Sequence, residues 1–130
     1  MYEITKDFRF EAAHTLLREV NADGSRRIHG HSYRAQVAIR GIPDLTTGMI
    51  MDLGTLERAM ASAQEALDHR FLDEINDLGP ATLENLSCWI WRHLEASIAG
   101  LARVTVFRDS SGEACSYVGP LSAAMTGDSR

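Results

Sequence analysis

Hydrophobic and polar positions alternate along two stretches near the start of the chain, as they do in β-strands that bury one face. Residues 2–14 carry their apolar set on even positions, interrupted only by Lys6, and residues 28–41 carry theirs on odd positions. The alternation predicts two strands, paired as an antiparallel hairpin across the charged loop 15–27. The two inward sets are Ile4, Phe8, Phe10, Ala12 and His14, and His29, His31, Tyr33, Ala35, Val37 and Ile39.

Helical spacing replaces the alternation in the middle of the chain. Asp52 is predicted to cap an amphipathic helix that stops near Asp68-His69, and a second helix is predicted to open at Thr82, just after Pro80. Between the second strand and the first helix we expect a turn over 42–48 and a short strand-like run over 49–51. The two apolar stripes are Leu53, Leu56, Ala59, Met60, Ala63 and Leu67, and Leu83, Leu86, Ile90 and Leu94.

The chain then returns to strands, predicted over 103–109 and 114–117 and joined by a turn at Ser110-Ser111-Gly112. The order ββααββ predicts an α+β domain, with a four-stranded antiparallel sheet and two helices on one face. Such a sheet leaves edges exposed, and exposed edges favour assembly between subunits.

Length and composition narrow the class of protein. We expect one domain over 1–120 and a flexible, small and polar tail over 121–130. The net charge of −5 argues against binding to nucleic acid, and the sequence shows neither a signal peptide nor a membrane-spanning apolar run. Cys88 and Cys115 form no paired motif, which favours a cytoplasmic location.

Three of the predicted inward residues are histidines. His29 and His31 lie two positions apart on one strand face, and His14 lies on the neighbouring strand. This set suits a tetrahedral Zn²⁺ with its fourth position open, the arrangement of a catalytic zinc. An inward histidine is more often a hydrogen-bonded core residue, and the residues alone leave that interpretation open.

Several separated motifs occur in register along the chain and together resemble one known family. They are Phe10-Glu11-Ala12-Ala13-His14, His29-Gly30-His31, Leu67-Asp68-His69, Pro80-x-Thr82-x-Glu84-Asn85 and the late strand that ends in Asp109. Over residues 2–118 the chain resembles the 6-pyruvoyl-tetrahydropterin synthase / 6-carboxy-tetrahydropterin synthase family. The resemblance implies the tunnelling fold, an oligomeric barrel of trimers paired into hexamers, and active sites at subunit interfaces. It also implies that His14, His29 and His31 are zinc ligands.

The resemblance assigns roles to five further residues. The substrate it implies is 7,8-dihydroneopterin triphosphate, whose side-chain hydroxyls zinc would acidify. Asp68 and His69 would move protons, Asp109 would anchor the pterin ring through its N–H donors, and Thr82 and Glu84 would help to bind it. Taken without the resemblance, these residues also suit a helix end, a turn and a helix N-terminus.

The chain departs from the family at Ser25. Bacterial members usually carry a cysteine four residues before the first histidine of the His-x-His motif, and it acts as the base. Three alternatives stay open: Glu19 or Asp23 is the base, Ser25 positions a water while His69 transfers protons, or turnover is slow or absent.

The function we expect is that of a zinc-dependent lyase acting on 7,8-dihydroneopterin triphosphate. The leading product is 6-carboxy-tetrahydropterin, the step toward deazapurines and queuosine, and 6-pyruvoyl-tetrahydropterin comes next. The alternative is a non-catalytic or slow pterin- or purine-binding zinc protein of the same fold.

Overall fold

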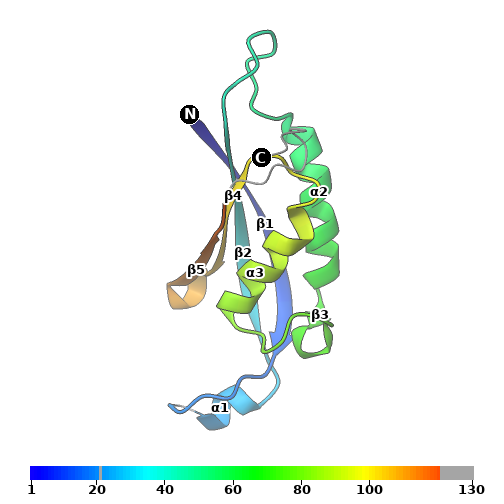
Figure 1. The fold of residues 1–130 in the computed structure, drawn as a ribbon. Coiled ribbons are helices and arrows are strands. Elements are labelled where there is room, and N and C mark those ends of the chain that lie inside the picture. Colours follow the sequence, from blue (N-terminus) through cyan, green and yellow to red (C-terminus); the bar gives the residue numbers. More distant parts are fainter. Residues whose placement is uncertain (21, 121–130) are drawn as a thin grey trace.

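Two long strands form the centre of the fold in the computed structural model, which describes residues 1–20 and 22–120. β1 (Tyr2–His14) and β2 (His29–Gly41) pair antiparallel along their whole length, from Tyr2 opposite Gly41 to His14 opposite His29 (Figure 1). The predicted hairpin is therefore confirmed. Tail residues 121–130, for which we predicted flexibility, lie outside the described residues.

The sequence predicts a charged loop between these strands, whereas the structure has a short helix there, α1 (Ala22–Arg26). A 2.8 Å hydrogen bond from the Leu16 N–H to the Ser25 carbonyl joins the two sides of this connection. Five residues are too few to show a helical period, so the pattern could not indicate this element.

The sheet has five strands, in the order β3-β1-β2-β4-β5. β4 (Leu101–Arg108) and β5 (Glu113–Val118) extend it antiparallel, whereas β3 (Arg70–Phe71) pairs parallel to β1. The expectation of four antiparallel strands is thus wrong in number and in type, because a two-residue strand leaves no alternation to detect.

The run 49–51 is not a strand, contrary to our expectation. Ile50 and Met51 pack against the hydrophobic core from an irregular segment, while Met49 stays 44% exposed. The apolar character of this run therefore reflects packing under a loop rather than pairing in a sheet.

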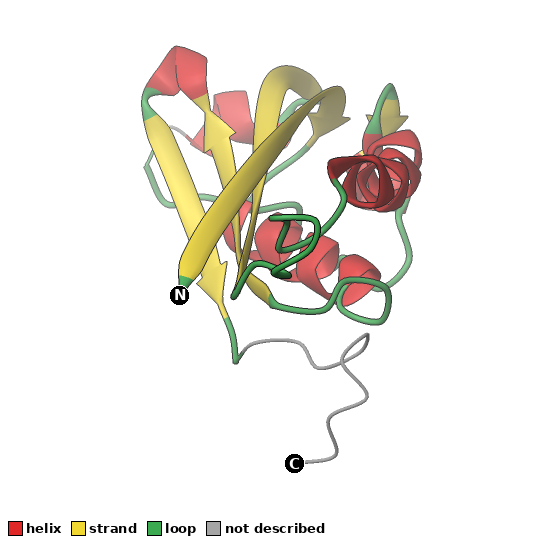
Figure 2. Ribbon diagram, turned by 90° about the horizontal axis from the view of Figure 1, so that it is seen from above, coloured by secondary structure: helices red, strands yellow, loops and turns green. Residues whose placement is uncertain are grey.

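Both predicted helices are present and cover the same face of the sheet (Figures 1 and 2). α2 (Leu53–Leu67) begins where the Asp52 carboxylate accepts from the Gly54 N–H at 2.7 Å, and α3 (Leu83–Leu94) begins where the Thr82 hydroxyl accepts from the Asn85 N–H at 3.1 Å. Two 3₁₀ turns, η1 (Leu72–Glu74) and η2 (Asp109–Ser111), complete the described structure. None of the helices in the described residues is long and apolar enough to cross a membrane.

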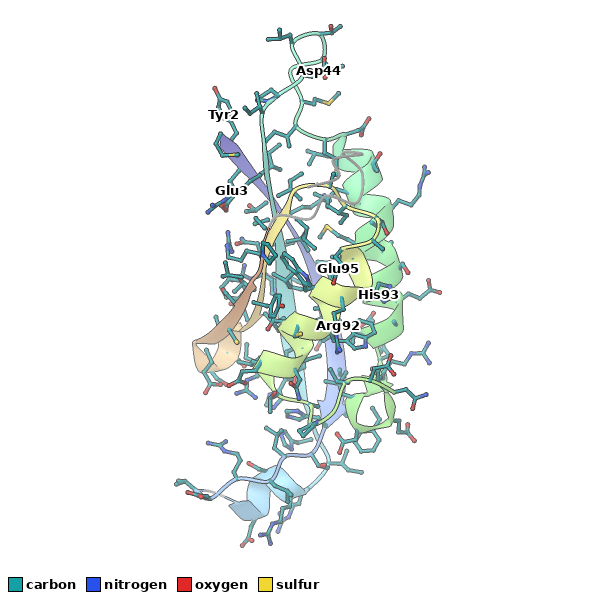
Figure 3. The ribbon with its side chains drawn as sticks, in the orientation of Figure 1. Tyr2, Glu3, Asp44, Arg92, His93 and Glu95 are labelled. Carbon is teal, nitrogen blue, oxygen red and sulfur yellow. The ribbon has the colours of Figure 1, made fainter. Side chains whose placement is uncertain are left out.

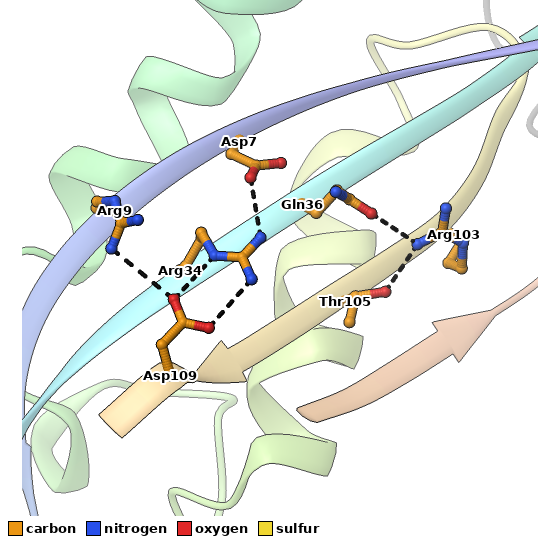
Figure 4. A network of polar contacts seen from close by, with 7 residues as sticks. All are labelled: Asp7, Arg9, Arg34, Gln36, Arg103, Thr105 and Asp109. Carbon is orange, nitrogen blue, oxygen red and sulfur yellow. Dashed lines mark hydrogen bonds and ion pairs between the residues drawn. The ribbon is translucent and has the colours of Figure 1, made fainter. Parts of the chain in front are cut away.

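The face of the sheet turned away from α2 and α3 is polar. Arg34 of β2 donates to Asp7 at 3.0 Å and to both carboxylate oxygens of Asp109, at 2.9 and 3.1 Å (Figure 4). A second cluster on the same face joins Arg103, Gln36 and Thr105. Alternation thus separates a hydrophobic core on one side of the strands from a charged surface on the other.

Candidate metal centre and adjoining pockets

Three histidines meet where β1 ends and β2 begins. His14 lies opposite His29 in the strand register, and His31 follows two residues later on the same face. One ring nitrogen of each lies within 4.8 Å of those of the other two. The site is at the end of the hairpin that carries α1, opposite the loop marked by Asp44 in Figure 3.

Backbone carbonyls set the orientation of two of these rings. The Nδ1–H of His14 donates to the Ala81 carbonyl at 2.8 Å, and that of His29 donates to the Arg27 carbonyl at 2.8 Å. In both rings Nε2 is then left with a free lone pair, which is the usual arrangement of a metal-ligating histidine. The Nε2 atoms of His14 and His31 are buried without a hydrogen-bond partner among the described residues, so the donor set suits Zn²⁺.

The electrostatics of the site favour neutral imidazoles. Burial lowers the pKa of His14, and burial, assisted by the Arg108 charge and the other two histidines, lowers the pKa of His31 to about 4. A metal binds the neutral ring, so the site is ready to accept a cation at neutral pH.

Asp68 and His69 form a pair next to this centre, and both are tied to Glu11 of β1. The Glu11 N–H donates to Asp68 Oδ1 at 2.9 Å, and its carbonyl accepts from the His69 N–H at 2.6 Å. The other Asp68 oxygen lies 3.1 Å from Nδ1 of His69. The Glu11 N–H also lowers the pKa of Asp68, which keeps the carboxylate charged beside the imidazole.

The ring of His69 is held outward. The residue adopts a left-handed backbone with φ of 58°, and its side chain is 80% exposed. His69 and His31 line one pocket, so the structure brings the predicted proton-transfer residue and a predicted zinc ligand to the same opening.

Besides His69, three residues were considered in place of the family's base, and they lie on the connection that contains α1. Ser25 is buried, whereas Glu19 and Asp23 are exposed. The Ser25 carbonyl accepts a hydrogen bond from the Leu16 N–H. The catalytic roles of the three residues stay predictions.

A second pocket, of about 650 Å³, receives two of the three predicted substrate-binding residues. Thr82 and Glu84 both line it. Thr82 also caps α3 and Glu84 lies in its first turn, so the expected structural roles are present as well. Asp109 lies apart, because Arg34 holds its carboxylate on the polar face of the sheet and lowers its pKa.

The residues that do enter this pocket beside Thr82 and Glu84 were not singled out from the sequence. Arg108 shares the buried face of β4 with Val104 and Val106, its side chain is 14% exposed, and it pairs with Glu113 of β5. Tyr33 is 1% exposed, and burial raises its pKa to about 12 although the nearby Arg108 charge opposes that effect. Strand parity could have identified Arg108, since it continues the alternation of the two valines.

Comparison with known proteins connects this geometry to a family. Residues 3–120 match the family model described as 6-pyruvoyl tetrahydropterin synthase. The chain is 35% identical over 127 residues to 6-carboxy-5,6,7,8-tetrahydropterin synthase of Synechocystis sp., covering 92% of this chain and 95% of that protein. It is 29% identical over 107 residues to 6-pyruvoyl tetrahydrobiopterin synthase of Homo sapiens, covering 72% and 74%.

The fold agrees with these matches. The solved structure of 6-pyruvoyl tetrahydropterin synthase from Caenorhabditis elegans is similar with a TM-score of 0.78 at 27% identity, covering 92% of this chain and 96% of that one. Family match, fold and histidine triad point the same way, and the chain therefore belongs to the 6-pyruvoyl tetrahydropterin synthase family.

Proposed function

We propose that the protein is a zinc-dependent lyase that converts 7,8-dihydroneopterin triphosphate to a 6-substituted tetrahydropterin. The 6-carboxy product is the leading candidate, because the relative of 35% identity bears that name, and the 6-pyruvoyl product comes next. The observation that carries the proposal is the convergence of three histidines, two of which have unpartnered buried Nε2 atoms. One of the three, His31, lines a pocket together with His69.

The metal would be held by His14, His29 and His31. Bound there, Zn²⁺ supplies a Lewis acid that makes neighbouring hydroxyls of a substrate easier to deprotonate. The protein's own contribution to proton transfer is the Asp68–His69 pair. Asp68 holds Nδ1–H of His69 and stabilises the ring when it is protonated, so Nε2 is free to take a proton from the substrate and to return it.

Thr82 and Glu84 are proposed to contact the pterin ring from the second pocket. Asp109 is proposed as a ring anchor from the resemblance alone. Its pairing with Arg34 on the opposite face speaks against that role within one subunit. We also propose assembly into a hexamer of two trimers, supported by the edge positions of β3 and β5 in the sheet.

The deciding experiment is an anaerobic incubation of zinc-loaded protein with 7,8-dihydroneopterin triphosphate, with products separated by mass. Wild type is run beside Ser25→Cys and beside His31→Ala, which is expected to lose both zinc and activity. Product from wild type establishes a catalyst that works with serine at position 25, and the product mass names the reaction. Product from Ser25→Cys alone identifies an intact pocket that lacks its base.

The second candidate is a non-catalytic or slow pterin- or purine-binding zinc protein, and Ser25 at the position of the family's cysteine favours it. A serine hydroxyl is a far weaker acid than a thiol, so it provides no anionic base at neutral pH. Absence of product from both wild type and Ser25→Cys would contradict the lyase and support this candidate.

A further inference from the structure

Four buried side-chain atoms have no hydrogen-bond partner in the part of the chain that the structure describes. They are Nε2 of His14, Nε2 of His31, the hydroxyl of Tyr33 and Nε of Arg108. A metal ion accounts for the first two, because both have a lone pair to offer. It does not account for Nε of Arg108, since Nε–H of an arginine is a donor and carries no lone pair. The Tyr33 hydroxyl, which can donate or accept, belongs to a residue that lines the same pocket as Arg108.

The two unexplained groups lie side by side and next to the histidines. Tyr33 follows His31 by two residues on the same strand face, and the two ring centroids are 5.7 Å apart. Arg108 is close enough to His31 for its charge to act on that ring, and it acts on the Tyr33 hydroxyl both by its charge and by a side-chain contact. Arg108 and Tyr33 also line the same pocket.

The Arg108 guanidinium is held in place, but one of its hydrogen-bond donors has no partner. One Nη atom of its guanidinium pairs with Glu113, directly opposite it on β5, and the side chain is largely buried. That pairing holds the planar group in place and leaves Nε without an acceptor. An unpaired buried donor of this kind destabilises the free protein, and an acceptor on a ligand would remove that cost.

The two unpartnered groups beside the metal centre, Nε–H of Arg108 and the Tyr33 hydroxyl, can therefore both donate hydrogen bonds to a ligand. We propose that Arg108 and Tyr33 form an oxyanion subsite beside the metal centre, which takes a carboxylate or phosphate group of the ligand. The donor edge of a pterin, with its amino group and ring N–H, is unsuited to this wall. This inference rests on the proposed function and narrows its ligand to a pterin that carries an acidic group on its side chain.

The test measures the binding of three pterins to zinc-loaded protein, and the quenching of pterin fluorescence reports the binding. 6-Carboxypterin offers a carboxylate, neopterin triphosphate offers a phosphate, and neopterin offers neither. Wild type should bind at least one of the acidic ligands tenfold or more tightly than neopterin, which corresponds to about 1.4 kcal/mol. Comparison of the two acidic ligands identifies the group that the subsite receives.

Variants assign the preference to the two side chains. Arg108→Gln should bring the affinities for acidic and neutral ligands within threefold of one another, and Tyr33→Phe should reduce the preference in part. Arg58→Gln removes an exposed arginine from α2 and should leave the preference for acidic ligands unchanged. If Arg108→Gln does not fold, Arg108→Lys takes its place, since it keeps the charge but loses Nε–H.

Equal affinity for all three pterins in wild type, or a preference that survives in both the Arg108 and the Tyr33 variants, would overturn the subsite. A further experiment separates the subsite from the proposed function. Acetate and inorganic phosphate are titrated into Co²⁺-loaded protein while its visible spectrum is recorded. If no pterin binds but an anion shifts the spectrum of wild type and not of the Arg108 variant, the subsite stands and the pterin function fails. If neither pterins nor anions bind, the subsite is refuted.

Discussion

Acidification of the metal-free protein should destabilise it through His31. The pKa of this ring is lowered from 6.5 to about 4 in the folded protein, chiefly by burial. The unfolded chain therefore takes up a proton at a higher pH than the folded chain does. The contribution of the neutral ring is complete above about pH 6.5 and is lost as the pH falls toward 4.

The size of this loss follows from the difference between the two pKa values. At about 1.4 kcal/mol per pH unit the difference sets an upper limit of about 3 kcal/mol. Because His31 is only partly buried, solvent screening reduces the expected loss to about 2 kcal/mol. The remaining acid-sensitive groups of the protein change the total, but they do so equally in a variant that lacks this one ring.

The assay is urea unfolding of chelator-treated protein at pH 7.5 and pH 4.5, for wild type and for His31→Gln, which is neutral at both. Wild type should lose about 2 kcal/mol more of its free energy of unfolding than the variant between these conditions. His93→Gln, which removes an exposed histidine from α3, should behave as wild type does. An equal loss in wild type and His31→Gln would refute the reasoning.

Three further outcomes are expected. Asp68→Asn keeps an acceptor for the Glu11 N–H but no longer stabilises a charged His69. The kcat should therefore fall tenfold or more, while the zinc content by mass spectrometry stays unchanged. An unaltered kcat would exclude the pair from proton transfer. Tyr33→Phe removes a buried, unpartnered hydroxyl, so the free energy of unfolding of the metal-free protein should rise by about 1 kcal/mol, and a decrease would indicate a partner for that hydroxyl. Thr82→Ala removes the cap of α3 and should lower the free energy of unfolding in urea by about 1 kcal/mol, whereas Thr82→Ser should leave it within a few tenths.

Periodicity predicted the elements that are long enough to express it. The alternation over β1 and β2 placed His14, His29 and His31 on one face, and the structure brings them together. Capping chemistry predicted the starts of α2 and α3. In each, the side-chain oxygen of the residue before the helix accepts a hydrogen bond from a backbone N–H two or three residues later.

Elements that depend on contacts distant in sequence were not predictable in this way. β3 exists because Arg70 and Phe71 meet β1 after the chain has turned at His69, and two residues carry no period of their own. The role given to Asp109 stays a prediction, and its place shows how sensitive such an assignment is to strand parity. Asp109 comes one position after the inward-facing Arg108, and that single step places its carboxylate on the opposite side of the sheet.

The left-handed backbone of His69 has a consequence for any attempt to make this protein more robust. A φ of 58° costs a residue with a side chain about 1 kcal/mol, and asparagine or glycine bears that conformation more easily. Directed evolution for heat resistance alone would thus favour Asn or Gly at position 69, which would remove an imidazole that is 80% exposed and contributes little packing. Thermal robustness and proton transfer then compete for one backbone position, and a library selected on both traits should retain histidine there.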